Sequence, residues 1–358
     1  MGLNSARRLE KLRQLLVEKR LEGILVSQAE NRFYVSGFSG SAGYLLITAS
    51  MAVLATDFRY IEQSKRQASD FEVFQITGKV DDWFPDLVKR AGISTLGFEA
   101  ESMTVAFARQ LSDSLAKSQM KVELTPVDGL VEAGRIVKEA DEIGLIAAAV
   151  KISDAAMNHI SAYIQEGMTE KAVAWEIERF MREHDSESVP FEVLVQSGPN
   201  SALPHAQPSS RKIGGGEPIV MDIGAKVGGY ASDLTRTICV GKPDAQFNKI
   251  HDIVLAAQLS AIALIKEGMT GDQADGFARI IIKEAGYGDF FGHSLGHGVG
   301  LAVHESPRLG PNSSDVLKNG MVFSVEPGIY LPGWGGVRIE DLATLDGGKI
   351  RVLSQAKK

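Results

Sequence analysis

The sequence predicts an α/β (α+β) fold in two domains, a smaller mixed-sheet α/β domain over residues 1–129 and a larger domain over residues 130–358. Two observations predict this division. Short β-like runs alternate with helical patterns up to about residue 129, and long Ala- and Ile-rich segments follow. The second part also repeats itself, because the tetrapeptide Glu-Gly-Met-Thr begins at Glu166 and again at Glu267, 101 residues later. A length of 358 residues likewise favours two domains over one.

The first part opens with an amphipathic segment, Ala6 to Arg20, in which leucines recur at helical spacing. Short apolar runs then predict strands at 23–27, 44–48, 52–56, 71–76, 95–98 and 121–125. Helical patterns separate several of them, at 59–67, 83–91 and 104–116. This alternation predicts a compact domain with a mixed sheet. We find no catalytic constellation in it and expect a structural or oligomerisation role.

A glycine-rich loop at 37–43 in this part is reminiscent of a phosphate-binding loop. It lacks the Gly-Lys-Ser/Thr ending of a P-loop, and an apolar run rather than a helix follows it. The sequence therefore predicts a plain turn into the next strand.

The second part begins with two helices in succession. Residues 138–165 form the first, and the second starts after Thr169, a good N-cap, and runs to about His184. The same pattern recurs with a helix at 245–266 and another that ends near Ala285. We therefore predict two similar helix pairs.

A β-rich stretch with two isolated acids follows each helix pair. Asp222 and Asp233 follow the first pair, and Glu326 and Glu340 follow the second. The offsets between corresponding acids, 104 and 107 residues, match the tetrapeptide repeat. Self-similarity at a nearly fixed offset indicates duplication. Two copies that pack about a pseudo-two-fold axis would bring both acid pairs to a shared centre.

The four acids stand alone inside apolar or glycine-rich runs, where an ionised carboxylate is costly to bury unless a cation pairs with it. Together they would carry charge −4, which two divalent metal ions would balance. A glycine-broken run with His293, His297 and His304 lies between the acid pairs, and carboxylates with a histidine are ordinary ligands for such metals. A zincin-type helix is rejected, because no Glu follows His293 and the glycines disfavour a helix.

Each acid also has a simpler interpretation. Asp222 and Asp233 could be turn acids on either side of a Gly-Gly hairpin, and Glu326 could be a charge at the end of a strand. Glu340 could merely pair with Arg338, two residues earlier. The metal-site hypothesis is favoured, because otherwise each of these separate interpretations would have to be correct at the same time.

Composition excludes several classes. Hydrophobic content of 44% and charged content of 23% are ordinary for a globular protein, and a net charge of −7 without a basic stripe argues against nucleic-acid binding. Cys239 is the only cysteine, which excludes a disulfide scaffold and a thiolate metal site. We see no apolar run long enough to span a bilayer and no signal peptide at residues 1–6, so we expect a cytoplasmic enzyme without a membrane partner.

The second part resembles the metallopeptidase family that contains prolidase, aminopeptidase P and methionine aminopeptidase, which has the pita-bread fold. The resemblance covers about the last two-thirds of the chain, and the first part resembles the smaller N-terminal domain of the creatinase and prolidase branch. All five metal-ligand positions of that family carry the expected residue types, namely Asp222, Asp233, His297, Glu326 and Glu340. The matching segments are Met221–Gly224, Ser232–Thr237, His293–Gly300, Val303–Glu305, Val325–Gly328 and Val337–Asp341. Creatinase shares the fold without the full metal set and fits less well.

The resemblance implies a dinuclear site. Asp222 would bind one metal ion, Asp233 and Glu340 would bridge both, and His297 and Glu326 would complete the other. A metal-bridging hydroxide would then attack the carbonyl of an Xaa-Pro bond. Four carboxylates and one imidazole favour manganese, with cobalt or zinc as alternatives.

Further roles follow from the same resemblance. His304 would stabilise the oxyanion, and Glu326 would carry a proton to the leaving proline nitrogen. His205, His293 and Arg338 would orient the substrate or support the ligands, and for Arg338 these two roles are equally weighted. Phe191 resembles a substrate-pocket position, although it could equally belong to the core.

The implied substrate is a small peptide with proline at its second position, and relatives of this kind are commonly homodimers. A dipeptidase needs a cation for the proline carboxylate, which Arg308 could supply, whereas an aminopeptidase needs an open groove. The sequence leaves these open, with the compact layout favouring the dipeptidase. A non-catalytic binding module on the same fold is a third hypothesis, and it is disfavoured because no ligand is missing.

Overall fold

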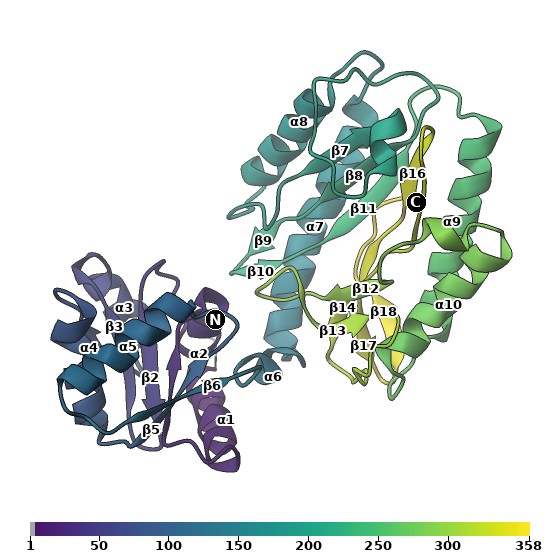
Figure 1. Cartoon of the computed structure of the whole chain (residues 1–358). Helices are drawn as coiled ribbons and strands as arrows, with labels where there is room; N and C mark the ends of the chain where they lie inside the picture. The colour runs from purple at the N-terminus through teal and green to yellow at the C-terminus, as the bar shows by residue number, and fades with distance from the viewer. Residues whose placement is uncertain (1–3) are drawn as a thin grey trace. The chain divides into compact units, whose positions relative to one another are not determined.

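The computed structural model describes residues 4–358 (Figure 1). Residues 1–3, part of the stretch in which we expect no targeting signal, lie outside the described residues. The chain divides into two compact units, the first ending at Arg135 and the second running from Ile136 to Lys358. Each unit has its own buried hydrophobic core.

A six-stranded sheet with the order β4-β3-β2-β1-β5-β6 forms the centre of the first unit. Its strands are β1 (Gly23–Val26), β2 (Tyr44–Thr48), β3 (Ala52–Thr56), β4 (Glu72–Gln75), β5 (Thr95–Glu99) and β6 (Glu123–Val127). β2 is antiparallel to both β1 and β3, whereas β4 is parallel to β3, β5 to β1, and β6 to β5. The predicted mixed sheet is confirmed. The last strand lies two residues later than predicted and includes Pro126, which an edge strand tolerates.

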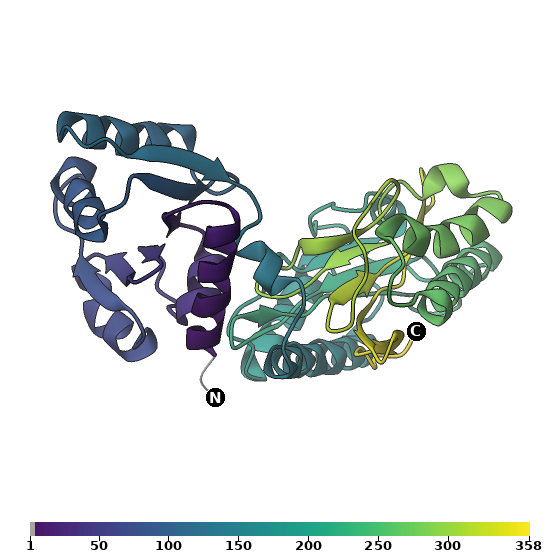
Figure 2. The ribbon, with the colours of Figure 1, turned by 90° about the horizontal axis from the view of Figure 1, so that it is seen from below.

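Helices cover this sheet on both faces (Figure 2). They are α1 (Ser5–Glu18), α2 (Ala29–Ser36), α3 (Ile61–Gln67), α4 (Val80–Ala91), α5 (Val105–Lys117) and the short α6 (Glu132–Arg135), with a 3₁₀ turn η1 (Phe58–Tyr60) before α3. α1 buries the predicted leucine stripe of Leu9, Leu12 and Leu16. α4 and α5 pack on the opposite face with alternate strand residues such as Leu25 and Leu46.

The glycine-rich loop is a turn, as predicted. α2 ends at Gly37, whose φ of 76° lies in the left-handed region that favours glycine. The chain then passes directly into β2.

The second unit contains two helix pairs, α7 (Ala140–Tyr163) with α8 (Glu170–Glu183) and α9 (Ala245–Leu264) with α10 (Gly271–Glu284). All four helices were predicted, with ends that differ by one or two residues. In each pair the two helices pack against each other.

Two sheets lie beside these helices, a three-stranded sheet β11-β8-β7 and a five-stranded sheet β13-β12-β14-β17-β18, with two ribbons β10-β9 and β15-β16. The strands are β7 (Leu194–Ser197), β8 (Ile219–Ile223), β9 (Lys226–Val227), β10 (Tyr230–Ala231), β11 (Leu234–Ile238), β12 (Gly296–Gly298), β13 (Glu305–Leu309), β14 (Val322–Val325), β15 (Gly328–Leu331), β16 (Gly335–Arg338), β17 (Asp341–Asp346) and β18 (Lys349–Val352). The 3₁₀ turns are η2 (Gly198–Ala202) and η3 (Gly288–Phe290). The apolar run at 321–330 is two strands rather than one, because Pro327 interrupts it after Glu326.

The two Glu-Gly-Met-Thr segments have matching backbones. Gly167 and Gly268 have φ values of 86° and 85°, and the threonine of each segment caps the helix that follows it. The methionine carbonyl accepts a hydrogen bond from Ile213 in the first copy and from Leu317 in the second, at 2.9 and 2.8 Å. These partners are 104 residues apart, the same offset as Asp222 and Glu326. The backbone therefore repeats as the sequence predicts.

The helix α7 corrects one expectation. It is long and apolar enough to cross a membrane by length and composition alone, with a mean hydropathy of 1.2. However, it buries Ala156, Met157 and Ile160 in a core shared with α8 and the three-stranded sheet. This packing is typical of the core helix of a globular unit, which passes the same test.

Candidate metal centre

The four isolated acids lie together in one cavity of about 450 Å³ in the second unit. Asp222 belongs to β8 and Asp233 immediately precedes β11, while Glu326 immediately follows β14 and Glu340 precedes β17. The two halves of the duplication meet here, because the backbone N–H of Glu340 donates to the carbonyl of Thr235 at 3.1 Å. The hydroxyl of Thr235 also donates to Glu340 Oε2 at 2.7 Å.

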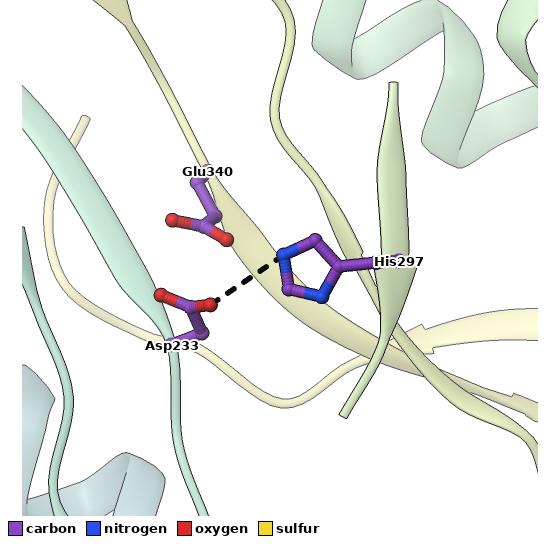
Figure 3. Close-up of side chains that lie close together, drawn as sticks. All are labelled: Asp233, His297 and Glu340. Carbon is purple, nitrogen blue, oxygen red and sulfur yellow. Dashed lines mark ion pairs between the residues drawn. The ribbon is translucent and has the colours of Figure 1, made fainter. Parts of the chain in front are cut away.

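His297 points from β12 into this group of acids (Figure 3). Its Nε2 is 3.2 Å from Glu326 and 3.7 Å from Asp233. Its Nδ1 faces the carbonyl of Gly298 at 3.2 Å, which leaves Nε2 directed at the carboxylates. Asp233, His297 and Glu340 offer ligand atoms that all lie within 4.8 Å of one another.

The glycines on either side of His297 have a steric cause. A Cβ at Gly296 would lie 2.0 Å from the carbonyl oxygen of Ser324, and one at Gly298 would lie 2.1 Å from that of Ser306. β12 is therefore packed so closely between β14 and β13 that only glycine fits beside the histidine. The glycine-broken run is thus a property of the packing that places His297.

Arg338 pairs with Asp222 rather than with Glu340. Its Nη2 donates to Asp222 Oδ2 at 2.8 Å, and its side chain is only 3% exposed. Its Nε and Nη1 donate to the hydroxyls of Thr235 and Tyr330 at 3.1 and 2.9 Å. The simpler interpretation in which Glu340 only neutralises Arg338 is therefore wrong.

The electrostatics of the site call for a cation. Burial raises the pKa of Asp233 and of Glu340 well above the usual range, and neighbouring carboxylates raise both further. Burial also raises the pKa of Asp222, although Arg338 opposes it. Asp222 Oδ1 is buried without a hydrogen-bond partner in the part of the chain that the structure describes. This orphaned oxygen, among carboxylates and one imidazole, fits divalent metal ions.

Glu326 and His297 form a charged pair when no metal is bound. Burial acts to raise the pKa of Glu326, but the hydrogen bond and charge of His297 outweigh it and lower the pKa to about 2. For His297, burial lowers the pKa, and Glu326 outweighs it and raises the value to about 9. A histidine binds a metal ion only when its imidazole is neutral, so metal binding has to remove this proton from His297.

We therefore expect metal binding to release protons at pH 6 to 7. His297, with a pKa of about 9, holds a proton in the metal-free site and loses it to the metal, and the raised pKa values of Asp233 and Glu340 act in the same direction. Metal affinity should rise with pH, because protons then compete less. Calorimetry of metal binding in buffers of different ionisation enthalpy measures the release directly. Identical heats in all buffers would contradict this assignment.

The remaining predicted residues, His205, His293, His304 and Phe191, line the same cavity. His304 is exposed, and its ring lies 4.2 Å from that of His297. Desolvation lowers the pKa of His304, and the neighbouring His297 lowers it further, which favours a neutral imidazole that can donate an N–H.

Both ring nitrogens of His293 are engaged. Nε2 is 2.9 Å from the hydroxyl of Tyr330, and Nδ1 is 2.8 Å from the carbonyl of Ser294. Because Arg338 donates to the same hydroxyl, the tyrosine O–H is free to donate to His293. His293 is therefore positioned to hold Tyr330 and Arg338 in place.

Sequence reasoning missed Tyr330, which is buried and links His293 to Arg338. Its only signal was a phenol hydroxyl in an apolar run. It also missed Glu192 and Gln207, which line the cavity beside Phe191 and His205 and carry no distinctive spacing.

Comparisons with known proteins agree with this geometry. Residues 144–346 match the model of metallopeptidase family M24, and residues 8–137 match the creatinase/prolidase N-terminal domain. The chain is similar to the uncharacterized peptidase YqhT of Bacillus subtilis, with 44% identity over 93% of this chain and 94% of the relative. It is also similar to the solved structure of an Xaa-Pro dipeptidase from Bacillus anthracis, with a TM-score of 0.95, 41% identity and 99% of each chain covered. An X-Pro aminopeptidase from Thermotoga maritima matches with a TM-score of 0.89 and 37% identity, covering 98% of each chain.

A donor set built for divalent metal ions thus lies in a chain that both domain models match. The chain belongs to metallopeptidase family M24, and its second unit is the metallopeptidase domain.

Proposed function

We propose that this chain is an Xaa-Pro dipeptidase that works with two divalent metal ions, with Xaa-Pro aminopeptidase as the alternative. One observation carries the proposal, the convergence of five metal-ligand side chains and the cation Arg308 on a single cavity. The similarity to chains described as Xaa-Pro dipeptidases supports it.

Asp222, Asp233, His297, Glu326 and Glu340 would hold the ions, with Asp233 and Glu340 shared between them. When bound, the metal ions would supply a water of lowered pKa and polarise the substrate carbonyl. Four carboxylates and one imidazole favour manganese over cobalt or zinc. Elemental analysis of protein purified without a chelator identifies the metal.

Two side chains would act on the substrate beside the ions. His304, exposed in the cavity and kept neutral by its lowered pKa, would donate its N–H to the oxyanion that forms at the carbonyl. Glu326, which accepts a hydrogen bond from Ser324 at 3.0 Å, would carry a proton to the proline nitrogen. That nitrogen belongs to a tertiary amide and must be protonated to leave.

Other residues would position the machinery. Arg338 holds Asp222 through the 2.8 Å ion pair, and His293 holds Arg338 through Tyr330. Of the two roles for Arg338, supporting the ligands is therefore favoured. His205 and Phe191, which line the cavity, would contact the peptide.

Arg308 favours the dipeptidase over the aminopeptidase. It lies opposite His297 in the β12–β13 pairing, and its side chain lines the cavity. One guanidinium nitrogen donates to the carbonyl of Pro311 at 3.0 Å, which holds the side chain but leaves its charge available. A free proline carboxylate, present only in a dipeptide, would pair with this cation.

Replacing Arg308 by Ala should raise KM for Gly-Pro by about tenfold to 100-fold, because a charged hydrogen bond is lost. Cleavage of a longer Gly-Pro-peptide, which lacks the carboxylate at that position, should change little. Arg351→Ala, at an exposed arginine of β18, is the matched control. If wild type prefers the longer peptide and Arg308→Ala leaves KM for Gly-Pro unchanged, the aminopeptidase is the better description.

The non-catalytic alternative would show neither transition metal nor peptidase activity after addition of manganese, whereas the proposed enzyme loses activity with a chelator and regains it with manganese. We further propose a cytoplasmic homodimer, in which the first unit could supply the contact. Measurement of the mass in solution tests the dimer.

A further inference from the structure

The first unit contains a second cavity, of about 810 Å³, whose lining residues all belong to that unit. Its volume falls in the range of small-molecule sites. The proposed peptidase chemistry makes no use of it, because the metal-ligand residues all belong to the second unit.

This cavity lies at the carboxyl ends of parallel strands. β1, β3, β4 and β5 run in one direction. Four residues that follow these strands line the cavity, namely Ser27, Asp57, Ile76 and Ser102. The chain builds the sheet outward from β1 to β4 on one side and then continues with β5 on the other side of β1. In open α/β sheets, ligands bind at the carboxyl ends of strands beside such a reversal of strand order.

Three aromatic side chains that stack on one another line the cavity. The ring of Tyr44 stacks on Trp83 with centroids 5.6 Å apart and on Phe107 with centroids 5.4 Å apart. The planes are inclined by only 20° and 14°. A flat or cyclic apolar group would pack well against such a surface.

A buried cation lines the same cavity. Arg32 is 5% exposed, and its two terminal nitrogens donate to the carbonyls of Ser27 and Gly40. Its Nε has no partner among the residues that the structure describes. The buried carboxylate nearby, Glu99, already accepts hydrogen bonds from Ser27 and from the backbone of Gln28 and does not line the cavity. Burial lowers the pKa of Arg32 and the charge of Glu99 opposes this effect, but no ion pair joins the two among the described residues. A carboxylate ligand could therefore pair with Arg32.

The acids at the rim do not cancel this cation. Asp57 pairs with Arg59, and Asp81 pairs with Lys117, each at 2.8 Å. The third acid of the lining, Asp113, acts on the same Lys117. Lys79 adds a further positive charge to the lining.

We propose that this cavity binds a small organic carboxylate with a flat or cyclic apolar body. The carboxylate lies against Arg32, and the ring packs along Tyr44, Trp83 and Phe107. Free amino acids with ring side chains belong to this class, so the first unit is a ligand-binding domain in addition to any part it has in assembly.

Calorimetric titration of the full-length protein tests the proposal with three probes. L-phenylalanine and 3-phenylpropanoate carry both the ring and the carboxylate, whereas 2-phenylethylamine carries the ring and an amino group but no carboxylate. We expect saturable binding of both acids and none of the amine. Phe107→Ala should weaken the binding at least about tenfold because a wall of the site is lost. Phe58→Ala, at a phenylalanine that is 75% exposed and outside the cavity, is the matched control and should bind as wild type does.

A second pair of variants separates this site from the metal centre. Binding should persist in Asp233→Asn, which alters only the catalytic cavity. It should be lost in Gln110→Trp, which fills the cavity from an exposed position of α5 and remains informative if Phe107→Ala does not fold. Absence of saturable binding of both acids would overturn the proposal. So would equal binding of the amine, retention of binding in Phe107→Ala and Gln110→Trp, or loss of binding in Asp233→Asn.

Discussion

Replacing Asp233 by Asn should reduce kcat/KM for Gly-Pro by at least about 100-fold and lower the metal content of the purified protein. The carboxylate of Asp233 lies within 4.8 Å of the ligand atoms of both His297 and Glu340, so it could share an ion with either of them. An amide of the same size keeps the packing, but it removes one negative charge and one of the two carboxylate oxygens that would be shared between the ions. We therefore expect weaker binding of both metal ions, and not of one ion alone.

The measurement pairs steady-state kinetics with elemental analysis, at fixed pH and with manganese added back. Asp346→Asn, at an exposed aspartate on the end of β17, is the matched control and should keep both activity and metal. A variant that retains near-normal turnover and a full metal content would show that Asp233 does not bridge the ions. A variant that loses metal but regains full turnover at high manganese concentration would show that Asp233 contributes only to metal affinity.

The positions of the acids could be predicted because burial of charge leaves a strong signal. A carboxylate alone in an apolar strand, such as Asp222 in β8, is explained only by a buried partner. The repeated tetrapeptide then indicated that Glu326 occupies the equivalent place in a second copy. Local pattern and duplication together therefore predicted which residues meet without any knowledge of the distances between them.

The partners of these acids could not be predicted in the same way. Arg338 lies two residues from Glu340 in the sequence, yet it pairs with Asp222. It extends from β16, and a hydrogen bond to Tyr330 of the neighbouring strand β15 helps to hold its side chain in that direction. Such a choice depends on the crossing of chain segments that are more than 100 residues apart. Sequence periodicity specifies the face of a strand and carries no information on which distant strand meets that face.

The cavity of the first unit could not be predicted from the sequence for a related reason. Arg32, Tyr44, Trp83 and Phe107 come from α2, β2, α4 and α5, and each has an ordinary place in its own element. No spacing joins them. Only the strand order, with β5 placed beside β1, brings them to one edge of the sheet.

Replacing His304 by Gln should lower kcat by about 100- to 1,000-fold while KM for Gly-Pro and the metal content change little. His304 is exposed and close to His297, but it is not part of the group of ligand atoms formed by Asp233, His297 and Glu340. A group that donates to charge developing in the transition state affects kcat more than substrate binding. Because burial and the neighbouring His297 lower the pKa of His304, its imidazole stays neutral to a lower pH than a free imidazole, so its protonation should not limit activity near neutral pH.

The split between kcat and metal content separates this role from a structural one. His184→Gln, at an exposed histidine outside the cavity, is the matched control and should behave as wild type does. If His304→Gln lost metal in parallel with activity, His304 would support the ligands instead of the oxyanion. If it raised KM alone, the ring would bind the ground state of the peptide, and stabilisation of the oxyanion would fall to the metal ions and the backbone.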